Sequence, residues 1–237
     1  METEIISAIR AELLQQADEK ARSSAQTFFK ESAKFYGVKS AVVSRIAAEY
    51  YRQIKHYDKQ VVFTLCEALL QSDYSEEAFI AFEWSYRLRD KYEPGDFILL
   101  EKWLNKYVNN WAKCDVLCNH TIGAFIEKYP QYIDDIRGWA RQDNRWLRRA
   151  SAVSLIIPAR KGKFLEEIFA IADILLHDED DLVRKGYGWM LKEASRQHQK
   201  EVFNYVVRNK ATMPRTALRY AIEKMPEDLR RQAMVKD

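Results

Sequence analysis

The chain has 237 residues, enough to bury a hydrophobic core in one large or two small domains. Its formal net charge is +3, which points to no class of partner, and its three cysteines, an odd number, argue against a disulfide framework and for a reducing compartment. No stretch approaches 18 consecutive apolar residues, and the N-terminus has an acidic amphipathic pattern. We therefore expect no membrane segment and a cytoplasmic location.

Helical spacing of apolar residues runs through the whole chain. Glycine and proline are scarce, at 7 and 5 residues, and no stretch has the alternation of a strand. The first stripe includes Ile5, Ile9 and Leu13. A second helix is predicted over Ser24 to Phe35, with Gly37 after its end as a left-handed cap. The remaining predicted helices begin at Ser40, 58, Ser75 and Pro94 and then cover 111–128, 131–141, 144–157, 164–177, 181–195, 198–208, 214–224 and 227–235.

Similar segments recur about every 35 residues. The starts at Asn109, Asp143 and Asp178 align so that Trp111 matches Trp146, and Arg148-Arg149 match Arg184-Lys185. Helix pairs repeating at this period are typical of an α-solenoid, in which each pair buries its apolar face against its neighbours. We therefore predict an all-α fold, an α-solenoid forming one domain over 1–237.

Positive charge is concentrated in one window. Between Arg137 and Lys163 there are eight basic residues and one acidic residue, a local net charge of +7, so the rest of the chain is slightly acidic. If repeat-equivalent cations line one concave face, they form a ladder that suits the phosphates of a DNA duplex. The alternative is a set of solvated helix faces, which is what most charge runs are. The predicted DNA-binding cations are Arg145, Arg148, Arg149, Arg160, Lys161, Lys163, Arg184 and Lys185.

The segment 156–164 interrupts the regular helical spacing. It contains two isoleucines, a turn-forming Gly162 and three cations, a pattern that allows a short basic hairpin projecting from the solenoid. Pro158 limits the strand pairing of such a hairpin. An ordinary loop between helices is the alternative.

At this point the sequence resembles a known family. W-x-x-x-D at Trp111 and Asp115, D-N-x-W-L-x-R from Asp143 to Arg149, and K-x-x-G-W-x-L-x-E from Lys185 to Glu193 are similar to motifs of the AlkD-type DNA glycosylases, which are built of HEAT-like repeats. The resemblance runs across most of the chain, is densest between about 102 and 223, and implies a right-handed α-solenoid of HEAT-like repeats. Members of that superfamily remove N3- and N7-alkylated purines from duplex DNA while gripping its backbone.

The resemblance implies a role for several residues. Asp115 would be the catalytic carboxylate that stabilises the positively charged sugar and directs water. Trp111 and Trp189 would pack against the deoxyribose, and Arg149 would hold a phosphate. The chemistry is reasonable by itself, because an alkylated purine is already a cationic leaving group and needs no general acid, metal or other cofactor. A helical spacing of four residues also places Trp111 and Asp115 on one face.

Three positions depart from the family pattern. Phe28 and Lys39 stand where the AlkD-type enzymes carry a tyrosine and a glutamine that line the groove, and Leu182 replaces an aromatic residue. With the basic segment after Pro158, these differences resemble the AlkF and AlkG branch, whose members bind branched DNA and lack clear base excision. Phe28 and Lys39 are therefore included among the predicted DNA contacts.

Other reactive side chains have simpler interpretations. Cys114, Cys118 and His120 are too few for a zinc site, and the two cysteines are expected to fill the core. His56 and His198 have no evident nucleophile beside them. We expect Trp146 to be buried, and Trp111 and Trp189 to face the groove. The tryptophans expected to pack between helices are Trp84, Trp103 and Trp139.

Three functions follow from these patterns. The first is a monomeric DNA-binding protein that grips damaged or branched DNA by its phosphates, with weak or no base excision. The second is an active alkylpurine glycosylase that uses Asp115. The third is a protein-binding HEAT scaffold. It is the least favoured, because peptide grooves are more often lined with asparagine and apolar residues than with rows of arginine.

Overall fold

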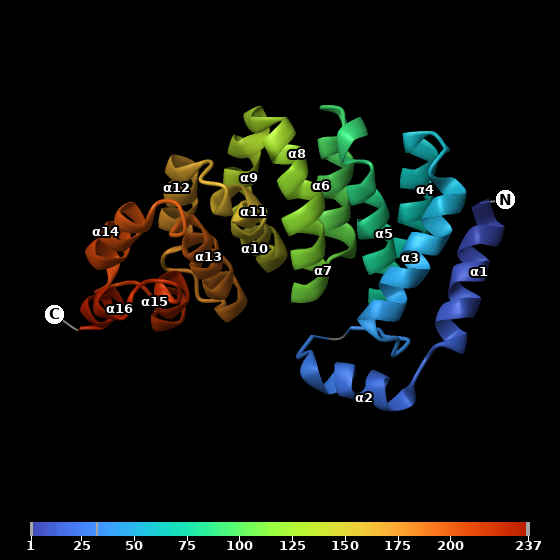
Figure 1. Cartoon of the computed structure of the whole chain (residues 1–237), viewed down its shortest axis with the longest axis horizontal. Helices are drawn as coiled ribbons and strands as arrows, with labels where there is room; N and C mark the ends of the chain where they lie inside the picture. Colours follow the sequence, from blue (N-terminus) through green and yellow to red (C-terminus); the bar gives the residue numbers. More distant parts are fainter. Residues whose placement is uncertain (1, 32, 236–237) are drawn as a thin grey trace. The chain divides into compact units, whose positions relative to one another are not determined.

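A computed structural model describes residues 2–31 and 33–235 of the chain (Figure 1). Within these residues the regular structure is sixteen α-helices and three short 3₁₀ or π segments, with no β-strand beyond one isolated bridge between Lys34 and Tyr74. The predicted all-α fold is confirmed. None of the helices in the described residues is long and apolar enough to cross a membrane.

The helices group into two compact units, Met1–Leu117 and Cys118–Asp237. The prediction of a single repeat domain over 1–237 stays a prediction. The first unit contains α1 (Glu2–Gln15), α2 (Glu19–Phe28), α3 (Ser40–Ile54), α4 (Lys59–Leu70), α5 (Ser75–Arg87), α6 (Asp96–Tyr107) and α7 (Trp111–Val116).

Helix α5 forms the centre of the first unit. It packs against α3, α4 and α7, and α1 covers α3 and α4. Trp84 of α5 is fully buried, and its indole Nε1 donates a hydrogen bond to the carbonyl of Ala47 in α3 at 2.8 Å. Trp103 of α6 is also fully buried. Both tryptophans therefore pack between helices, as predicted.

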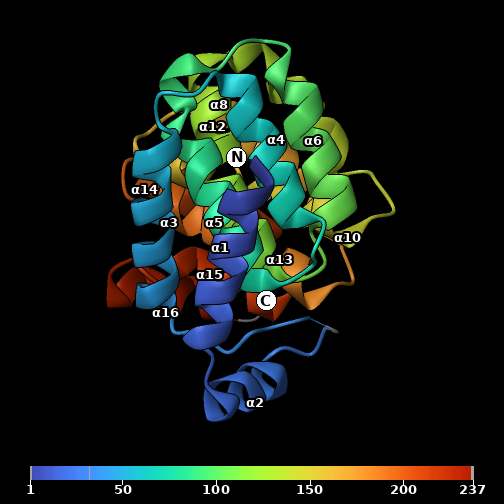
Figure 2. The ribbon, with the colours of Figure 1, turned by 90° about the vertical axis from the view of Figure 1, so that its right-hand side faces the viewer.

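The helix predicted over Ser24 to Phe35 begins and ends earlier, as α2. Asp18 caps it by accepting a hydrogen bond from the amide of Ala21, and residues 33–39 lie outside any helix. The carboxylate of Glu76 accepts hydrogen bonds from the amides of Tyr36, Gly37 and Val38 at 2.9 to 3.2 Å, and Gly37 has a left-handed backbone (φ 90°). Residue 32 of this stretch lies outside the described residues. Figures 1 and 2 both show α2 apart from the packed helices of its unit.

The second unit is organised around a long helix, α13. It contains α8 (Gly123–Lys128), α9 (Ile133–Trp139), α10 (Arg145–Val153), α11 (Ile156–Arg160), α12 (Leu165–Leu175), α13 (Asp181–Ala194), α14 (Gln199–Asn209), α15 (Arg215–Ile222) and α16 (Glu227–Met234). Helices α10, α11, α12 and α15 pack against α13. Close approach to α15 depends on Gly188, because a Cβ there would lie 2.7 Å from Cβ of Tyr220.

The helix predicted over 111–128 is confirmed as one helical run with a change of pitch. It starts as α7, continues as a π segment from Leu117 to Ile122, and ends as α8. π turns of this kind occur often at functional sites. Sequence periodicity did not indicate this turn, since apolar residues continue at helical spacing through it.

The hairpin predicted at 156–164 is wrong. Residues Ile156 to Arg160 form helix α11, and the turn that follows has left-handed backbone at Gly162 (φ 78°) and Phe164 (φ 62°). Ile156 and Ala159 are buried and Ala159 donates its amide to the carbonyl of Leu155. The two isoleucines therefore serve a helix that packs on α13, and Pro158 fits within the first turn of a helix, where no amide donor is needed.

Candidate nucleic-acid interface

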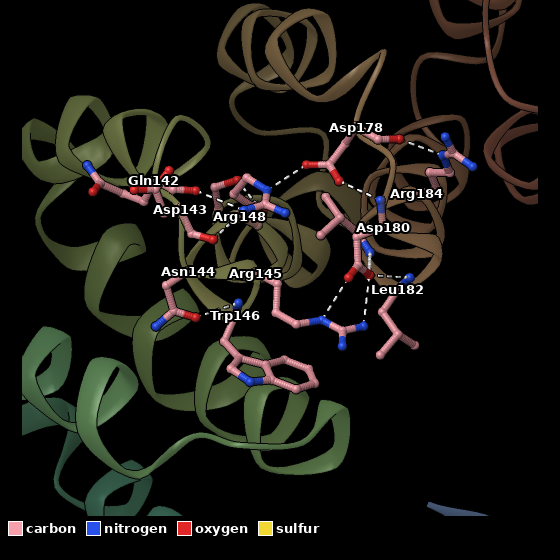
Figure 3. Close-up of polar contacts among 12 residues, drawn as sticks. Gln142, Asp143, Asn144, Arg145, Trp146, Arg148, Asp178, Asp180, Leu182 and Arg184 are labelled. Atoms are coloured by element: carbon pink, nitrogen blue, oxygen red, sulfur yellow. Dashed lines mark hydrogen bonds and ion pairs between the residues drawn. The ribbon is translucent and has the colours of Figure 1, made fainter. Parts of the chain in front are cut away.

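The first two cations of α10 bind acidic residues at the start of α13 (Figure 3). Arg145 forms an ion pair with Asp180 at 2.8 Å, and its guanidinium lies over the ring of Trp146, 4.9 Å from the centroid. Arg148 pairs with Asp178 at 2.6 Å and donates to the carbonyls of Gln142 and Asp143. Trp146 is buried, as predicted.

The two helices are capped in the same way, as the repeat alignment implies. Asn144 accepts a hydrogen bond from the amide of Trp146, and Asp180 accepts from the amides of Leu182 and Val183. These amides are therefore occupied by caps of the protein. Arg184 donates from Nε to the carbonyl of Asp178, so that Arg148 and Arg184 meet at one residue.

Lys185 follows Arg184 on α13 and is also paired with an acid. Its ammonium pairs with Asp181 at 2.7 Å, and both side chains are more than a third exposed. Their hydrogen bond raises the pKa of Lys185 and lowers the pKa of Asp181. We call Arg145, Arg148, Arg184 and Lys185 the cap-end cluster, because they surround the capped start of α13.

Arg149 is placed differently from its neighbours. It is 5% exposed, and its guanidinium donates to the carbonyl of Leu182 on α13. Gly186 of α13 lies beside it, since a Cβ at that position would be in ordinary contact with Cγ of Arg149 at 3.4 Å. Within the second unit Arg149 therefore ties α10 to α13.

The cations at and after the ends of α11 and α13 are also paired with acids. Arg160 and Arg196 both bind the same carboxylate oxygen of Glu193, at 2.8 and 2.6 Å. Lys161 and Lys163 bind Glu127 at 2.7 and 3.0 Å. Arg160, Lys161, Lys163 and Arg196 form what we call the turn-end cluster.

The two carboxylates that bind the turn-end cluster, those of Glu193 and Glu127, both have a lowered pKa. Burial acts to raise the pKa of Glu193, but the hydrogen bonds and charges of Arg160 and Arg196 outweigh it, and the pKa lies below the usual 4.5. The pKa of Glu127 is lowered in the same way, as Lys161 and Lys163 overcome the effect of its burial. Neutral pH therefore leaves these ion pairs fully charged.

In the first unit the structure brings together two of the predicted aromatic residues. Phe28 is 68% exposed and lies edge-on to Trp111, with 5.9 Å between the ring centroids. Phe29 stacks on Trp111 at 5.2 Å with an interplanar angle of 17°. Trp111 is half-buried as a result. The non-helical residues after Phe29 also place Lys39 on the surface, directly before α3.

The first turn of α7 is held firmly, and with it Trp111 and Asp115. Asn110 caps the helix through the amide of Lys113. The ammonium of Lys113, 1% exposed, donates to the carbonyl and carboxylate of Asp73, and Asn109 donates to the same carboxylate at 2.7 Å. Asp115 lies one turn after Trp111 and is partly exposed, and Trp189 on α13 is half-buried.

The cysteines near Asp115 belong to the core. Cys114 and Cys118 are both fully buried, as predicted. Within the described residues there is no group of three or more His, Cys, Asp or Glu side chains placed to hold a metal ion.

Sequence reasoning missed the acidic partners and Phe29. Four of the acids, Asp178, Asp180, Glu127 and Glu193, lie outside the basic window by sequence and meet it only through packing. The acidic run from Asp178 to Asp181 was the available signal, because it precedes a helix that aligns with the arginines of α10. Phe29 was indicated only by its place beside Phe28.

Comparisons with known proteins agree with this fold. The sequence model of the DNA alkylation repair enzyme family matches residues 9–225. A predicted DNA alkylation repair enzyme from Enterococcus faecalis superposes with a TM-score of 0.80 at 13% identity, covering 90% of this chain and 98% of the other. The protein smu.31 from Streptococcus mutans UA159 gives 0.59 at 22% identity, covering 78% and 98%.

A third similar structure was solved with DNA. It is the alkylpurine DNA glycosylase AlkC of Pseudomonas fluorescens, bound to DNA containing an abasic site analog, with a TM-score of 0.53 at 16% identity, covering 94% of this chain and 62% of that one. No protein with curated annotation matches the sequence significantly. Because the family match spans almost the whole chain, this protein belongs to the DNA alkylation repair enzyme family.

Proposed function

We propose that this protein binds damaged or branched DNA by its phosphate backbone, with weak or no base excision. The observation that carries the proposal is how its cations are held. Arg145 and Lys185 of the cap-end cluster are each about two-fifths exposed while their positions are fixed by acids at the helix start. Fixed cations lose little side-chain entropy on binding phosphate. Membership of the repair family and the likeness to a DNA-bound glycosylase add support.

Titration of labelled DNA tests the proposal. Binding to a plain duplex and to a three-way junction is expected below micromolar concentration, and the affinity should fall steeply as salt rises, with little dependence on sequence. The double variant Arg145→Gln/Lys185→Gln should bind more weakly and with a salt slope smaller by about 2. A matched control, Arg52→Gln/Lys55→Gln, removes two exposed cations at the C-terminal end of α3. Equal losses in both variants, or no salt dependence, contradict the proposal.

Active base excision is the second function, and the partial exposure of Asp115 favours it. A carboxylate on a partly exposed residue of the same helix as Trp111 is able to stabilise positive charge on a sugar. Alkylated DNA incubated with the wild type would then release methylated purines, and Asp115→Asn would abolish the release while leaving DNA affinity intact. Asp134→Asn, an exposed acid on α9, is the matched control. Excision that survives Asp115→Asn excludes this role.

A further inference from the structure

The two cation clusters lie at opposite ends of α13. The cap-end cluster surrounds Asp180, whereas the turn-end cluster is assembled on Glu193. At 1.5 Å per residue these two acids are about 20 Å apart along the helix axis. The continuous basic window of the sequence is therefore divided in space into two separate surfaces.

The turn-end cluster is built as a rigid surface. Gly162, with φ 78°, places its carbonyl 3.0 Å from Nε2 of His198, and an added Cβ would come within 3.3 Å of both Gln197 and His198. The turn after α11 is thus packed directly on the turn after α13. Glu127 of α8 and Glu193 of α13 hold the four cations from beneath, with exposed fractions of 16% and 4%.

Charge and exposure make this surface suitable for a polyanion. Four cations share two carboxylates, which leaves a net charge of +2. Each cationic side chain keeps between 42% and 53% of its surface exposed. Positive charge that exceeds its internal partners and is fixed in position favours phosphodiester oxygens.

A single backbone that follows α13 would find little to bind between the clusters. The stretch from Gly186 to Leu191 consists of glycine, apolar and aromatic residues, mostly buried against α10 and α15. Lys192 beyond it is only 13% exposed and is paired with Glu223. The gap corresponds to about six phosphates of one strand at 3.4 Å each. Two separate DNA segments, one at each cluster, therefore make more phosphate contacts than one strand that follows α13.

We propose that the turn-end cluster binds the phosphate backbone of a second DNA segment while the cap-end cluster holds the first. This inference rests on the proposed DNA binding. The partner is recognised by its phosphates alone, so the second contact has no sequence preference. It gives the protein two backbone contacts, which suits DNA in which two double-stranded segments come close together.

Stoichiometry with a short duplex of about 10 base pairs tests the inference, because one duplex about 34 Å long is able to span both clusters, whereas the proposal requires two duplexes at saturation. Sedimentation at low salt should show two duplexes per wild-type protein. Lys161→Gln/Lys163→Gln should bind one, and the control Arg52→Gln/Lys55→Gln should bind two. On a three-way junction, the lysine variant should lose about 2 from the salt slope.

A variant of opposite sign completes the test. Glu127→Gln leaves both lysines in place and removes a negative charge, so the second duplex should bind more tightly. Thermal unfolding verifies that each variant is folded. If wild type binds no DNA, the proposed function itself fails. Three outcomes overturn the second contact alone. The first is that wild-type protein binds only one duplex, and the second is that the lysine variant binds the same number of duplexes as wild type. The third is that polyglutamate displaces the second duplex but free duplex does not.

Discussion

At the scale of single residues, one carboxylate connects three parts of the first unit. Asp73 has a left-handed backbone (φ 66°) and accepts hydrogen bonds from Asn109 and from the buried Lys113. Burial lowers the pKa of Lys113, although Asp73 favours its charged form. The next residues bind the segment that follows α2, since the amide of Ser75 donates to the carbonyl of Lys34. The start of α7 and the segment that follows α2 are therefore both attached to the short stretch from Asp73 to Ser75.

Removing that carboxylate should destabilise the fold. Asp73→Ala leaves a buried ammonium without its charge partner, so we expect the free energy of unfolding to fall by about 3 kcal/mol, measured by urea denaturation. Asp73→Asn keeps an acceptor and tolerates the left-handed backbone, and should lose less. Adding Lys113→Met to Asp73→Ala should restore part of the loss. Strictly additive losses would show that the pair does not act as described.

The pairs around Glu193 predict a pH dependence. Its pKa is lowered in the folded state, so its contribution to stability is fully present above the unfolded value near 4.5 and is lost as pH falls through the folded pKa. Glu193→Gln should therefore reduce stability at pH 7 and make unfolding less dependent on pH below about 4.5. Urea midpoints at pH 7, 5 and 3 measure this. Parallel pH curves for both proteins would contradict it.

At the scale of elements, the packing of α13 on α15 depends on one glycine. Gly188→Ala would place a Cβ 2.8 Å from the carbonyl oxygen of Ala217, so we expect a loss of about 2–3 kcal/mol in unfolding free energy. Gly138→Ala in α9 is the control, because no described atom lies within 4 Å of its added Cβ. It should stabilise the protein by about 0.5–1 kcal/mol through lower backbone entropy of the unfolded chain. Equal effects at both sites would refute the close contact.

Among the described residues, helix α2 differs from the other α-helices in having no buried residue. None of its side chains, all within the described residues, is buried, and Phe28 at its end is exposed. We expect its amides to exchange with deuterium much faster than those of α5, because local opening exposes little apolar surface. Asp18→Ala removes the cap and should speed exchange in α2 without moving the global unfolding midpoint. Uniform protection of α2 and α5 would contradict this.

At the scale of the whole molecule, each compact unit carries a buried thiol. Cys66 in the first unit and Cys118 in the second are fully buried, and burial raises the pKa of the Cys66 thiol. A thiol reagent at pH 8 should label neither until urea opens the fold. Single-cysteine variants would then report the opening of each unit separately. Rapid labelling of either thiol in native protein would contradict its burial.

The sequence by itself determined the helical class, the positions of most helices, and the family. Helices α10 and α13 begin within one residue of the predicted starts at 144 and 181, and Trp84, Trp103 and Trp146 are buried, because these features depend on local chemistry and helical spacing. The resemblance of three ordered motifs to the AlkD-type enzymes agrees with the repair family match.

Tertiary structure alone decided how the charges are arranged. A window of basic residues gives no information on acids that reach it from elsewhere, so the pairing of Arg148 with Asp178 and of Lys161 with Glu127 was not predictable from spacing. The same holds for the helix at 156–160 and the non-helical residues before Lys39, which follow from packing on α13 and from the carboxylate of Glu76. Ion pairs between distant segments form only after the helices have packed, which is why one basic stretch became two separate surfaces.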